Sequence, residues 1–247
     1  MVEANVRASE AICQVCKPWF VQSESTRYYH PFDPAAASQA DYLNDLRFLS
    51  LDLNYARRPS EQMIAYLSEN GMIASRLDYF LQRKIWPQCI MGTDYYESSE
   101  SVVFADGSAR GSNVLGYYGL TRQYYERYRL PIMLTETNQI QGLNAAFWLE
   151  RQWANVLRLR QEDHPVIGFT WYSLTDQVDW DIDLRVQRHH VVANGLYDMA
   201  RRIRRAGVEY RRIIQAWSGA LADTDHPACS PDWLERPAAR LPPAGVV

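Results

Sequence analysis

Apolar residues gather into four short continuous runs along the chain, and these runs set the expected architecture. They occupy residues 19–22, 89–92, 132–135 and 166–171. A strand that is covered on both faces carries apolar side chains without alternation, so each run predicts a buried strand of a parallel sheet. Polar or aromatic residues follow every run directly, which places chemical groups at the strand ends.

Helical periodicity fills the intervals between these runs. Ser60 is a predicted N-cap of one helix, and Asn70-Gly71 is a predicted stop signal for the same helix. Strands that alternate with helices are typical of βαβ units, so the fold class is predicted to be α/β with a parallel sheet. The expected helices cover residues 60–70, 75–82, 117–129, 145–159 and 208–217.

Composition indicates a folded chain. Of the 247 residues, 47% are hydrophobic and 22% are charged, and the net charge is −3. A chain without a basic field is not expected to bind nucleic acid or an anionic membrane.

No run of 18 apolar residues and no apolar leader occurs, so a cytoplasmic protein is predicted. The domain is expected to span residues 1–217, and the Ala- and Pro-rich residues 218–247 are predicted to be a disordered tail.

Metal and cofactor chemistry receives little support from the sequence. Cys13 and Cys16 form an isolated Cys-x-x-Cys, which favours reduced thiols over a zinc or redox site. A metal-dependent hydrolase that uses His30, His189 and His190 is an alternative, but consecutive histidines point apart on a helix or strand. Phosphate-loop and dinucleotide glycine motifs do not occur, so no cofactor is expected.

The strongest chemical signal follows the third and fourth apolar runs. Glu136 ends the third run, with Asn138 close behind it, and barrel enzymes keep their functional groups at such strand ends. Taken alone, the end of the third run is explained equally well by a glutamate whose only role is to bind an arginine. The fourth run leads into a segment with Trp171, Asp179 and Trp180. Flat aromatic faces and carboxylates together suit the binding of a sugar.

Two of these segments resemble family 1 glycoside hydrolases, the β-glucosidase and 6-phospho-β-glucosidase group. Thr135-Glu136 and Asn138 are similar to the Thr-Glu-Asn motif of the family's seventh strand, with one residue inserted before the asparagine. Residues 171–180 resemble the family's Trp-Ser-Leu-x-Asp-Asn-x-Glu-Trp segment, with one residue inserted and with Asp179 in place of the sugar-binding glutamate.

Two further segments extend the resemblance to about residues 10–217. Residues 94–96 are similar to the family's Asn-Tyr-Tyr, which makes Tyr96 a substrate-binding candidate, and residues 195–198 resemble its Gly-Leu-Tyr before the final helix. The resemblance implies a TIM-type (β/α) barrel of which only the last four β/α units are present. It also implies retaining hydrolysis of β-D-glycosides, with Glu136 as the nucleophile. Asn138, Trp171, Asp179 and Trp180 are then further candidates for binding the carbohydrate.

The family's acid/base glutamate has no counterpart, because its Asn-Glu-Pro motif does not occur. Retention needs two carboxyl groups about 5–5.5 Å apart. Glu24, at the end of the first run, is the first candidate for the second carboxyl, followed by Asp94 and Asp179. The competing interpretation is a non-catalytic carbohydrate-binding barrel fragment that keeps Trp171 and Trp180 without an acid.

A half-barrel also predicts an assembly. Its first and last strands, which contain Val21 and Ile167, are left unpaired, and unpaired edges and exposed apolar faces template association. Two copies related by a twofold axis close a ring of eight strands, so a homodimer is expected. The alternatives are burial of the open face by the chain's own termini, or an unstable fragment of a longer protein.

Overall fold

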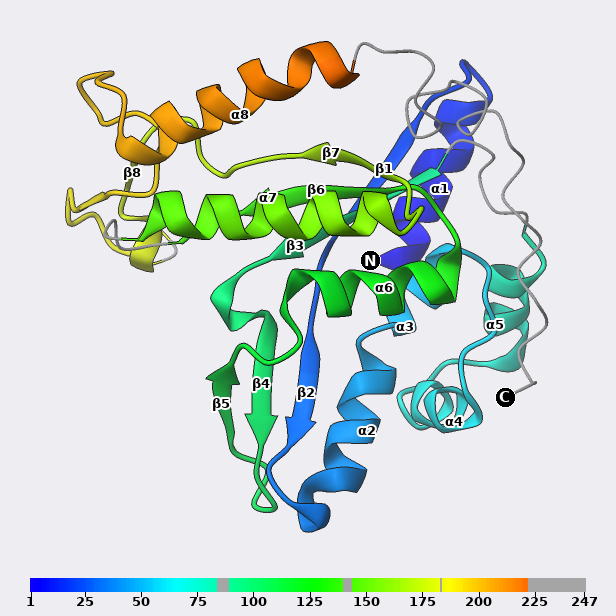
Figure 1. The fold of residues 1–247 in the computed structure, drawn as a ribbon. Helices are drawn as coiled ribbons and strands as arrows, with labels where there is room; N and C mark the ends of the chain where they lie inside the picture. Colours follow the sequence, from blue (N-terminus) through cyan, green and yellow to red (C-terminus); the bar gives the residue numbers. More distant parts are fainter. Residues whose placement is uncertain (84–88, 140–143, 183, 222–247) are drawn as a thin grey trace.

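The computed structural model describes residues 1–83, 89–139, 144–182 and 184–221. Its centre is a four-stranded sheet in the order β1-β3-β6-β7, and every neighbouring pair is parallel (Figure 1). The four expected strands and their parallel pairing are therefore confirmed. The strands are β1 (Phe20–Ser25), β3 (Cys89–Tyr95), β6 (Ile132–Thr137) and β7 (Val166–Phe169).

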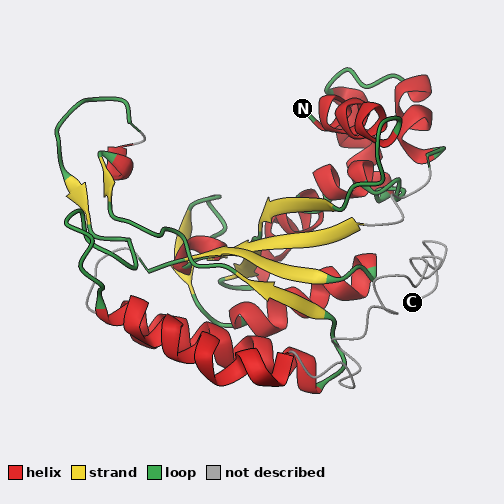
Figure 2. Ribbon diagram, turned by 90° about the horizontal axis from the view of Figure 1, so that it is seen from above, coloured by secondary structure: helices red, strands yellow, loops and turns green. Residues whose placement is uncertain are grey.

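Helices run along one face of this sheet (Figure 2), and the predicted helices are all present within a few residues of their expected bounds. Ser60 is the N-cap of α4, because its side chain accepts a hydrogen bond from the backbone N–H of Met63. The last helix extends beyond the predicted domain boundary at residue 217, and residues 222–247 of the predicted tail lie outside the described residues. The predicted helices are α4 (Glu61–Glu69), α5 (Ala74–Leu81), α6 (Gly116–Tyr128), α7 (Ala145–Gln161) and α8 (Arg205–Leu221), and a further helix, α1 (Val2–Cys13), precedes them.

A second, three-stranded sheet was not predicted. Its strands β2 and β4 are parallel, and β4 pairs with β5 in the antiparallel sense. The strands are only four residues long and β5 is almost entirely exposed, so no apolar run marks them in the sequence. The unpredicted elements are β2 (Tyr28–Pro31), β4 (Glu100–Val103), β5 (Ala109–Ser112), β8 (Gln177–Val178), β9 (Val191–Val192), α2 (Ala37–Leu46), α3 (Leu49–Asn54) and the 3-10 helices at Pro34–Ala36, Glu97–Ser99 and Trp180–Ile182.

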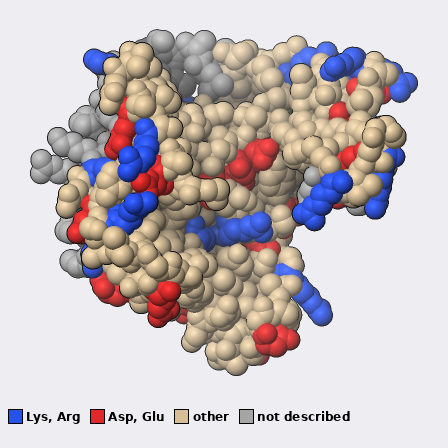
Figure 3. Space-filling view, turned by 180° about the vertical axis from the view of Figure 1, so that it is seen from behind, with Lys and Arg blue, Asp and Glu red and all other residues tan. Residues whose placement is uncertain are grey.

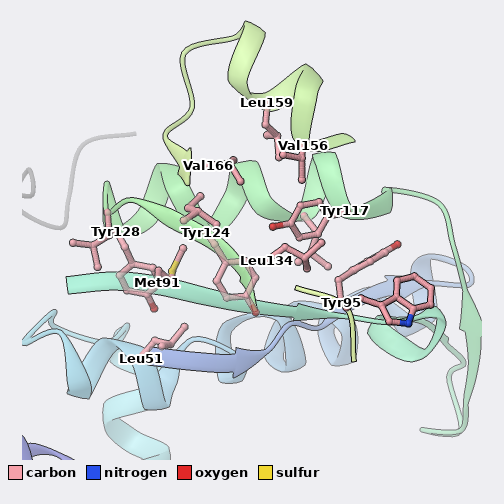
Figure 4. Packing of buried hydrophobic residues seen from close by; sticks show 14 of the residues in the cluster. Leu51, Met91, Tyr95, Tyr117, Tyr124, Tyr128, Leu134, Val156, Leu159 and Val166 are labelled. Atoms are coloured by element: carbon pink, nitrogen blue, oxygen red, sulfur yellow. The ribbon is translucent and has the colours of Figure 1, made fainter. Parts of the chain in front are cut away.

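The main core lies between the central sheet and helices α3, α6, α7 and α8, and Figure 4 shows part of it. Much of its volume is tyrosine, and the hydroxyls of four of the five fully buried tyrosines form hydrogen bonds, whereas the Tyr55 hydroxyl has none. Tyr117 and Thr93 share a hydrogen bond of 2.9 Å, and Tyr128 donates to Asp52 over 2.8 Å. Aromatic abundance in this chain therefore reflects packing to a large extent. The fully buried tyrosines are Tyr55, Tyr95, Tyr117, Tyr124 and Tyr128.

Across the described part of the chain, the helices are all too short or too polar to cross a bilayer.

Candidate active site

The carboxyl ends of the strands bring Asp94 into a small hydroxyl network on the sheet face opposite the helices. Residues that pair in register in a parallel sheet point to the same face. Ser23 pairs with Gly92, two residues before Asp94, and Ser23 Oγ donates to Asp94 Oδ1 over 2.9 Å. Thr135 Oγ1 donates to the same oxygen over 2.7 Å. Two hydroxyls from two neighbouring strands therefore fix this carboxylate.

Gly92 makes the network sterically feasible. A Cβ at Gly92 would lie 2.6 Å from Thr135 Cγ2 and 2.9 Å from Thr135 Oγ1, which is closer than van der Waals contact allows. The absence of a side chain thus lets Thr135 lean across β3 toward Ser23, whose Oγ is 3.1 Å from Thr135 Oγ1. We call this face, which carries Ser23, Asp94, Thr135 and Glu136, the concave face.

Glu136 joins the concave face through an irregularity in β6. Thr93 pairs with Leu134, but Asp94 pairs with Glu136, so Thr135 and Glu136 together oppose one residue of β3. An extra residue of this kind re-aims the side chain that follows it. Without the irregularity, strict alternation would place Thr135 and Glu136 on opposite faces of the sheet. The irregularity therefore brings the Glu136 carboxyl beside Asp94.

Burial raises the pKa of the Glu136 carboxyl above its ordinary value, a hydrogen bond from Tyr96 opposes the rise, and the negative charge of Asp94 adds to it. The same contact raises the pKa of the Tyr96 hydroxyl, after burial as the larger cause. Tyr96 is therefore a protonated donor that faces Glu136. The structure brings these two predicted site residues together, with Asp94 as their charged neighbour.

Glu24 lies on the other face of the sheet. It pairs in register with the buried Thr93, whose hydroxyl meets Tyr117 of α6, and Ser50 of α3 donates to Glu24 Oε2 over 3.3 Å. Burial raises the pKa of Glu24, Ser50 lowers it and the charge of Asp94 raises it. Period-two alternation along β1 is the physical reason: Ser23 takes the concave face, so Glu24 cannot. Asp94, and not Glu24, therefore shares the concave face with Glu136.

The two tryptophans of the predicted sugar platform differ in exposure. Trp171 is only 6% exposed and belongs to the main core, whereas Trp180 is 41% exposed. The ring beside Trp180 is Tyr172, with 5.7 Å between the ring centroids. The structure therefore presents Tyr172 with Trp180 and buries Trp171, which sequence analysis did not foresee. Residues 172–180 are as long as the family's segment from its first tryptophan to its last. An alignment that starts at Tyr172 therefore needs no insertion, and it could have shown this pairing of Tyr172 with Trp180 from the sequence.

The remaining predicted binding residues take part in the loops that follow β6 and β7. Asn138 is buried and its Nδ2 donates to the backbone oxygen of Asn194 over 3.0 Å. The Asp179 carboxylate accepts backbone N–H groups of residues 188–190 at 2.9, 3.0 and 2.9 Å. Burial raises the pKa of Asp179, but these donors hold it below its ordinary value. Through these three hydrogen bonds, the Asp179 carboxylate stabilises the conformation of its own loop.

A view from behind the helices shows this side of the molecule hollowed, with acidic side chains inside the hollow and basic ones beside it (Figure 3). Within the described residues, no three His, Cys, Asp or Glu side chains gather in a way that could hold a metal ion. His30 binds Glu100 over 2.8 Å, and His190 binds Asp181 over 3.0 Å.

Comparison with solved structures finds the same fold in a known glycosidase. The β-glucosidase from Thermotoga maritima in complex with deoxynojirimycin superposes with a TM-score of 0.70 and 16% identity, covering 87% of this chain and 54% of that chain. Its complex with noeuromycin gives a TM-score of 0.69, and its complex with glucoimidazole gives 0.66 at 15% identity. The chain therefore spans about half the length of these structures.

Searches by sequence add nothing to this likeness, since no family model and no curated protein matches the chain. At 16% identity, the likeness shows the fold alone: a mixed α/β arrangement around a parallel sheet, as in half of the β-glucosidase chain.

Proposed function

We propose that this chain carries the nucleophile of a retaining glycoside hydrolase that acts on β-D-glycosides, within half of a (β/α) barrel. The observation that carries the proposal is the placement of Glu136, which stands with Tyr96 and Asp94 at the carboxyl ends of parallel strands. Active sites of barrel enzymes occupy this end of the strands. A cytoplasmic location stays a prediction from the sequence.

The chemistry assigned to Glu136 is attack of its carboxylate on the anomeric carbon. The new C–O ester bond forms as the glycosidic C–O bond breaks, and the leaving oxygen departs with the electron pair and takes up a proton. Water then attacks the glycosyl ester, gives its proton to a base, and releases the sugar and the carboxylate. The Tyr96 hydroxyl, which lies near Glu136, is the proposed donor that orients this carboxylate for the attack.

For the second carboxyl we place Asp94 first, because its charge acts directly on Glu136 and the two residues pair in register. Glu24 and Asp179 follow, since Glu24 faces the helices and Asp179 is engaged by three backbone donors. The exposed Trp180 and its half-buried neighbour Tyr172 are the proposed aromatic contacts of the sugar, because accessible ring faces can meet sugar C–H groups.

A covalent label tests the assignment of the nucleophile. A 2-deoxy-2-fluoro-β-glucoside with a dinitrophenolate leaving group slows hydrolysis of the ester more than its formation, so the glycosyl-enzyme accumulates. We expect one adduct per chain, which mass spectrometry of peptides assigns to Glu136, and none in Glu136→Gln. A label on another residue would overturn the assignment. No label, together with measurable sugar binding, would favour the non-catalytic carbohydrate-binding fragment.

The proposed partner is a second copy of the chain, in a homodimer that closes the barrel over the concave face. Strands β1 and β7 are the edges of the central sheet as described, and Val21 on β1 is 47% exposed. Beside the β7 edge, an apolar cavity of about 380 Å³ opens between α7 and α8, lined by Trp153, Ile213 and Trp217 among others. Unpaired edges with apolar surface beside them favour association.

Light scattering at tens of micromolar tests this partner. We expect twice the chain mass of 28.6 kDa, and we expect Val21→Glu to give monomers because it places a charge on the covered face. The matched control is Val15→Glu, at a residue that is 87% exposed, which should stay dimeric. A monomeric parent chain would exclude the homodimer.

A further inference from the structure

Arg27 stands where β1 ends, beside the concave face. Exposure alternates along this stretch of the chain: Ser23 and Ser25 are exposed, the residue between them is half-buried, and after the buried Thr26 the pattern continues with the exposed Arg27. The backbone N–H of Thr26 donates to the backbone oxygen of Asp94 over 3.0 Å, so the chain still follows β3 at this point. Arg27 therefore extends the row of side chains that Ser23 begins on the concave face.

The Arg27 guanidinium reaches across the end of β3. Its Nη1 donates to the backbone oxygen of Ser98 over 3.0 Å, two residues beyond Tyr96. The main chain of Arg27 is fixed as well, because its N–H donates to the Tyr124 hydroxyl over 3.4 Å and its carbonyl accepts from Arg47 over 2.6 Å. The base of the side chain and one edge of the guanidinium are thus held, and its other N–H donors are left for a further acceptor.

This cation lacks a carboxylate of its own. Within the part of the chain that the structure describes, Arg27 forms no ion pair. Asp94 directs one carboxylate oxygen to the hydroxyls of Ser23 and Thr135 instead. Figure 3 shows basic side chains next to the acidic ones on this side of the molecule. Arg27 is therefore a fixed positive charge, open to solvent, on the face that carries the Asp94 and Glu136 carboxylates.

The strand order places these groups in a row across the sheet. Arg27 follows β1, Asp94 belongs to β3, Glu136 belongs to β6, and Trp180 lies in the segment that follows β7. In the proposed function, Trp180 contacts the sugar, Glu136 attacks the anomeric carbon, and Asp94 is the first candidate for the carboxyl that protonates the leaving oxygen. The leaving group then extends from Asp94 toward the end of β1. The aglycone therefore meets Arg27.

We propose that Arg27 selects β-glycosides whose aglycone carries a carboxylate. The inference rests on the proposed function for the direction in which the substrate lies. A guanidinium binds a carboxylate through charge-assisted N–H···O bonds, whereas Asp94 and Glu136 repel an anion that has no cation to meet. A phosphate monoester carries roughly −1.5 to −2 charges at neutral pH, so the same two acids repel it more strongly than a carboxylate. One arginine beside two acids therefore suits a monoanion.

Titration calorimetry of the full chain with two S-linked glucosides tests the proposal. The 4-carboxyphenyl and 4-carbamoylphenyl 1-thio-β-D-glucosides have nearly the same shape and differ by one charge. We expect the carboxylate to bind about fivefold tighter than the amide to the parent protein. In Arg27→Met we expect this preference to vanish or reverse, because Asp94 and Glu136 then repel the anion, while the Kd of the amide stays within about twofold. Raising the salt from about 50 to about 500 mM should shrink the preference of the parent.

Arg110→Met is the matched control. Arg110 is also exposed, but it belongs to β5 and lies over the Phe104 ring, so the preference for the carboxylate should persist in this variant. Loss of the preference in Arg110→Met as well as in Arg27→Met would make it an effect of net charge and overturn the proposal.

The remaining outcomes separate the role of Arg27 from the assignment of the nucleophile. Equal affinities for the two ligands in the parent, or binding of neither, would overturn the proposal. An equal loss of both ligands in Arg27→Met would overturn it too, because the bond to Ser98 would then be the whole role of the side chain. Calorimetry needs no turnover, so a glycosyl label on Glu136 would leave the proposed hydrolase standing in each of these cases. A preference for the carboxylate without such a label would support Arg27 while the nucleophile fails.

Discussion

Replacement of Glu136 by glutamine is expected to lower turnover of a dinitrophenyl β-glucoside by at least about 10³-fold, because an amide cannot form the glycosyl ester. The substrate is chosen so that departure of the aryloxide needs no acid, and formation of the glycosyl ester then depends on the nucleophile alone. The fold should remain intact, since the resolved interactions of the Glu136 carboxyl are those with Tyr96 and Asp94. Initial rates and circular dichroism of both proteins provide the measurement.

Two further carboxyl variants make this experiment discriminating. Glu24→Gln should lose less than tenfold, because Glu24 faces α3 rather than the concave face. Asp94→Asn should lose more, and azide should restore its turnover if Asp94 is the base, because azide attacks the glycosyl ester without needing deprotonation. Unchanged turnover in Glu136→Gln would exclude this residue as the nucleophile. A greater loss in Glu24→Gln than in Asp94→Asn would reverse their order.

The largest expected effect on stability comes from Glu100. This side chain is 1% exposed and ties the small sheet to the start of α6. Glutamine keeps the shape but turns an NH2 group toward buried donors, so Glu100→Gln should lower the free energy of unfolding by about 3 kcal/mol. Urea unfolding gives this value. The donors to the Glu100 carboxylate are the backbone N–H groups of Val114, Leu115 and Gly116 at 3.0, 2.8 and 2.8 Å, the Tyr95 hydroxyl at 3.2 Å, and His30 Nε2 at 2.8 Å.

The pH dependence of stability should change in the same variant. Burial raises the pKa of Glu100, but the hydrogen bonds from Leu115, His30 and their neighbours hold it below its ordinary value of 4.5. Its contribution is therefore full above pH 4.5 and is lost as the pH falls through the lower folded value. The difference in unfolding free energy between parent and Glu100→Gln should shrink over that acidic range.

A matched control uses another carboxyl that contacts α6. Glu162 binds Tyr118 but is 38% exposed, so Glu162→Gln should cost less than about 1 kcal/mol. An effect of Glu100→Gln no larger than this control would show that the buried carboxylate does not anchor α6.

The sequence by itself determined the central sheet and the position of Glu136 along the chain. Buried parallel strands must be apolar on both faces, so each strand appears in the sequence as a continuous run of apolar residues. The helices between the strands could be predicted from the helical periodicity of their apolar residues and from the N-cap at Ser60. The end of an apolar run marks the end of a strand, so Glu136 could be placed at the edge where barrel enzymes keep their chemistry. Short, exposed strands such as β5 carry no apolar run and were missed.

The tertiary structure alone decided which groups meet. A sequence gives the alternation of a strand but not its register against its neighbours, so the separation of Glu24 from Asp94 emerged only when Ser23 and Gly92 were paired. The irregularity of β6, which turns Glu136 toward Asp94, has no sequence signature of its own. Burial is likewise a property of the packed chain. It is set by contacts between residues distant in sequence, and it put Trp171 in the core and left Trp180 exposed.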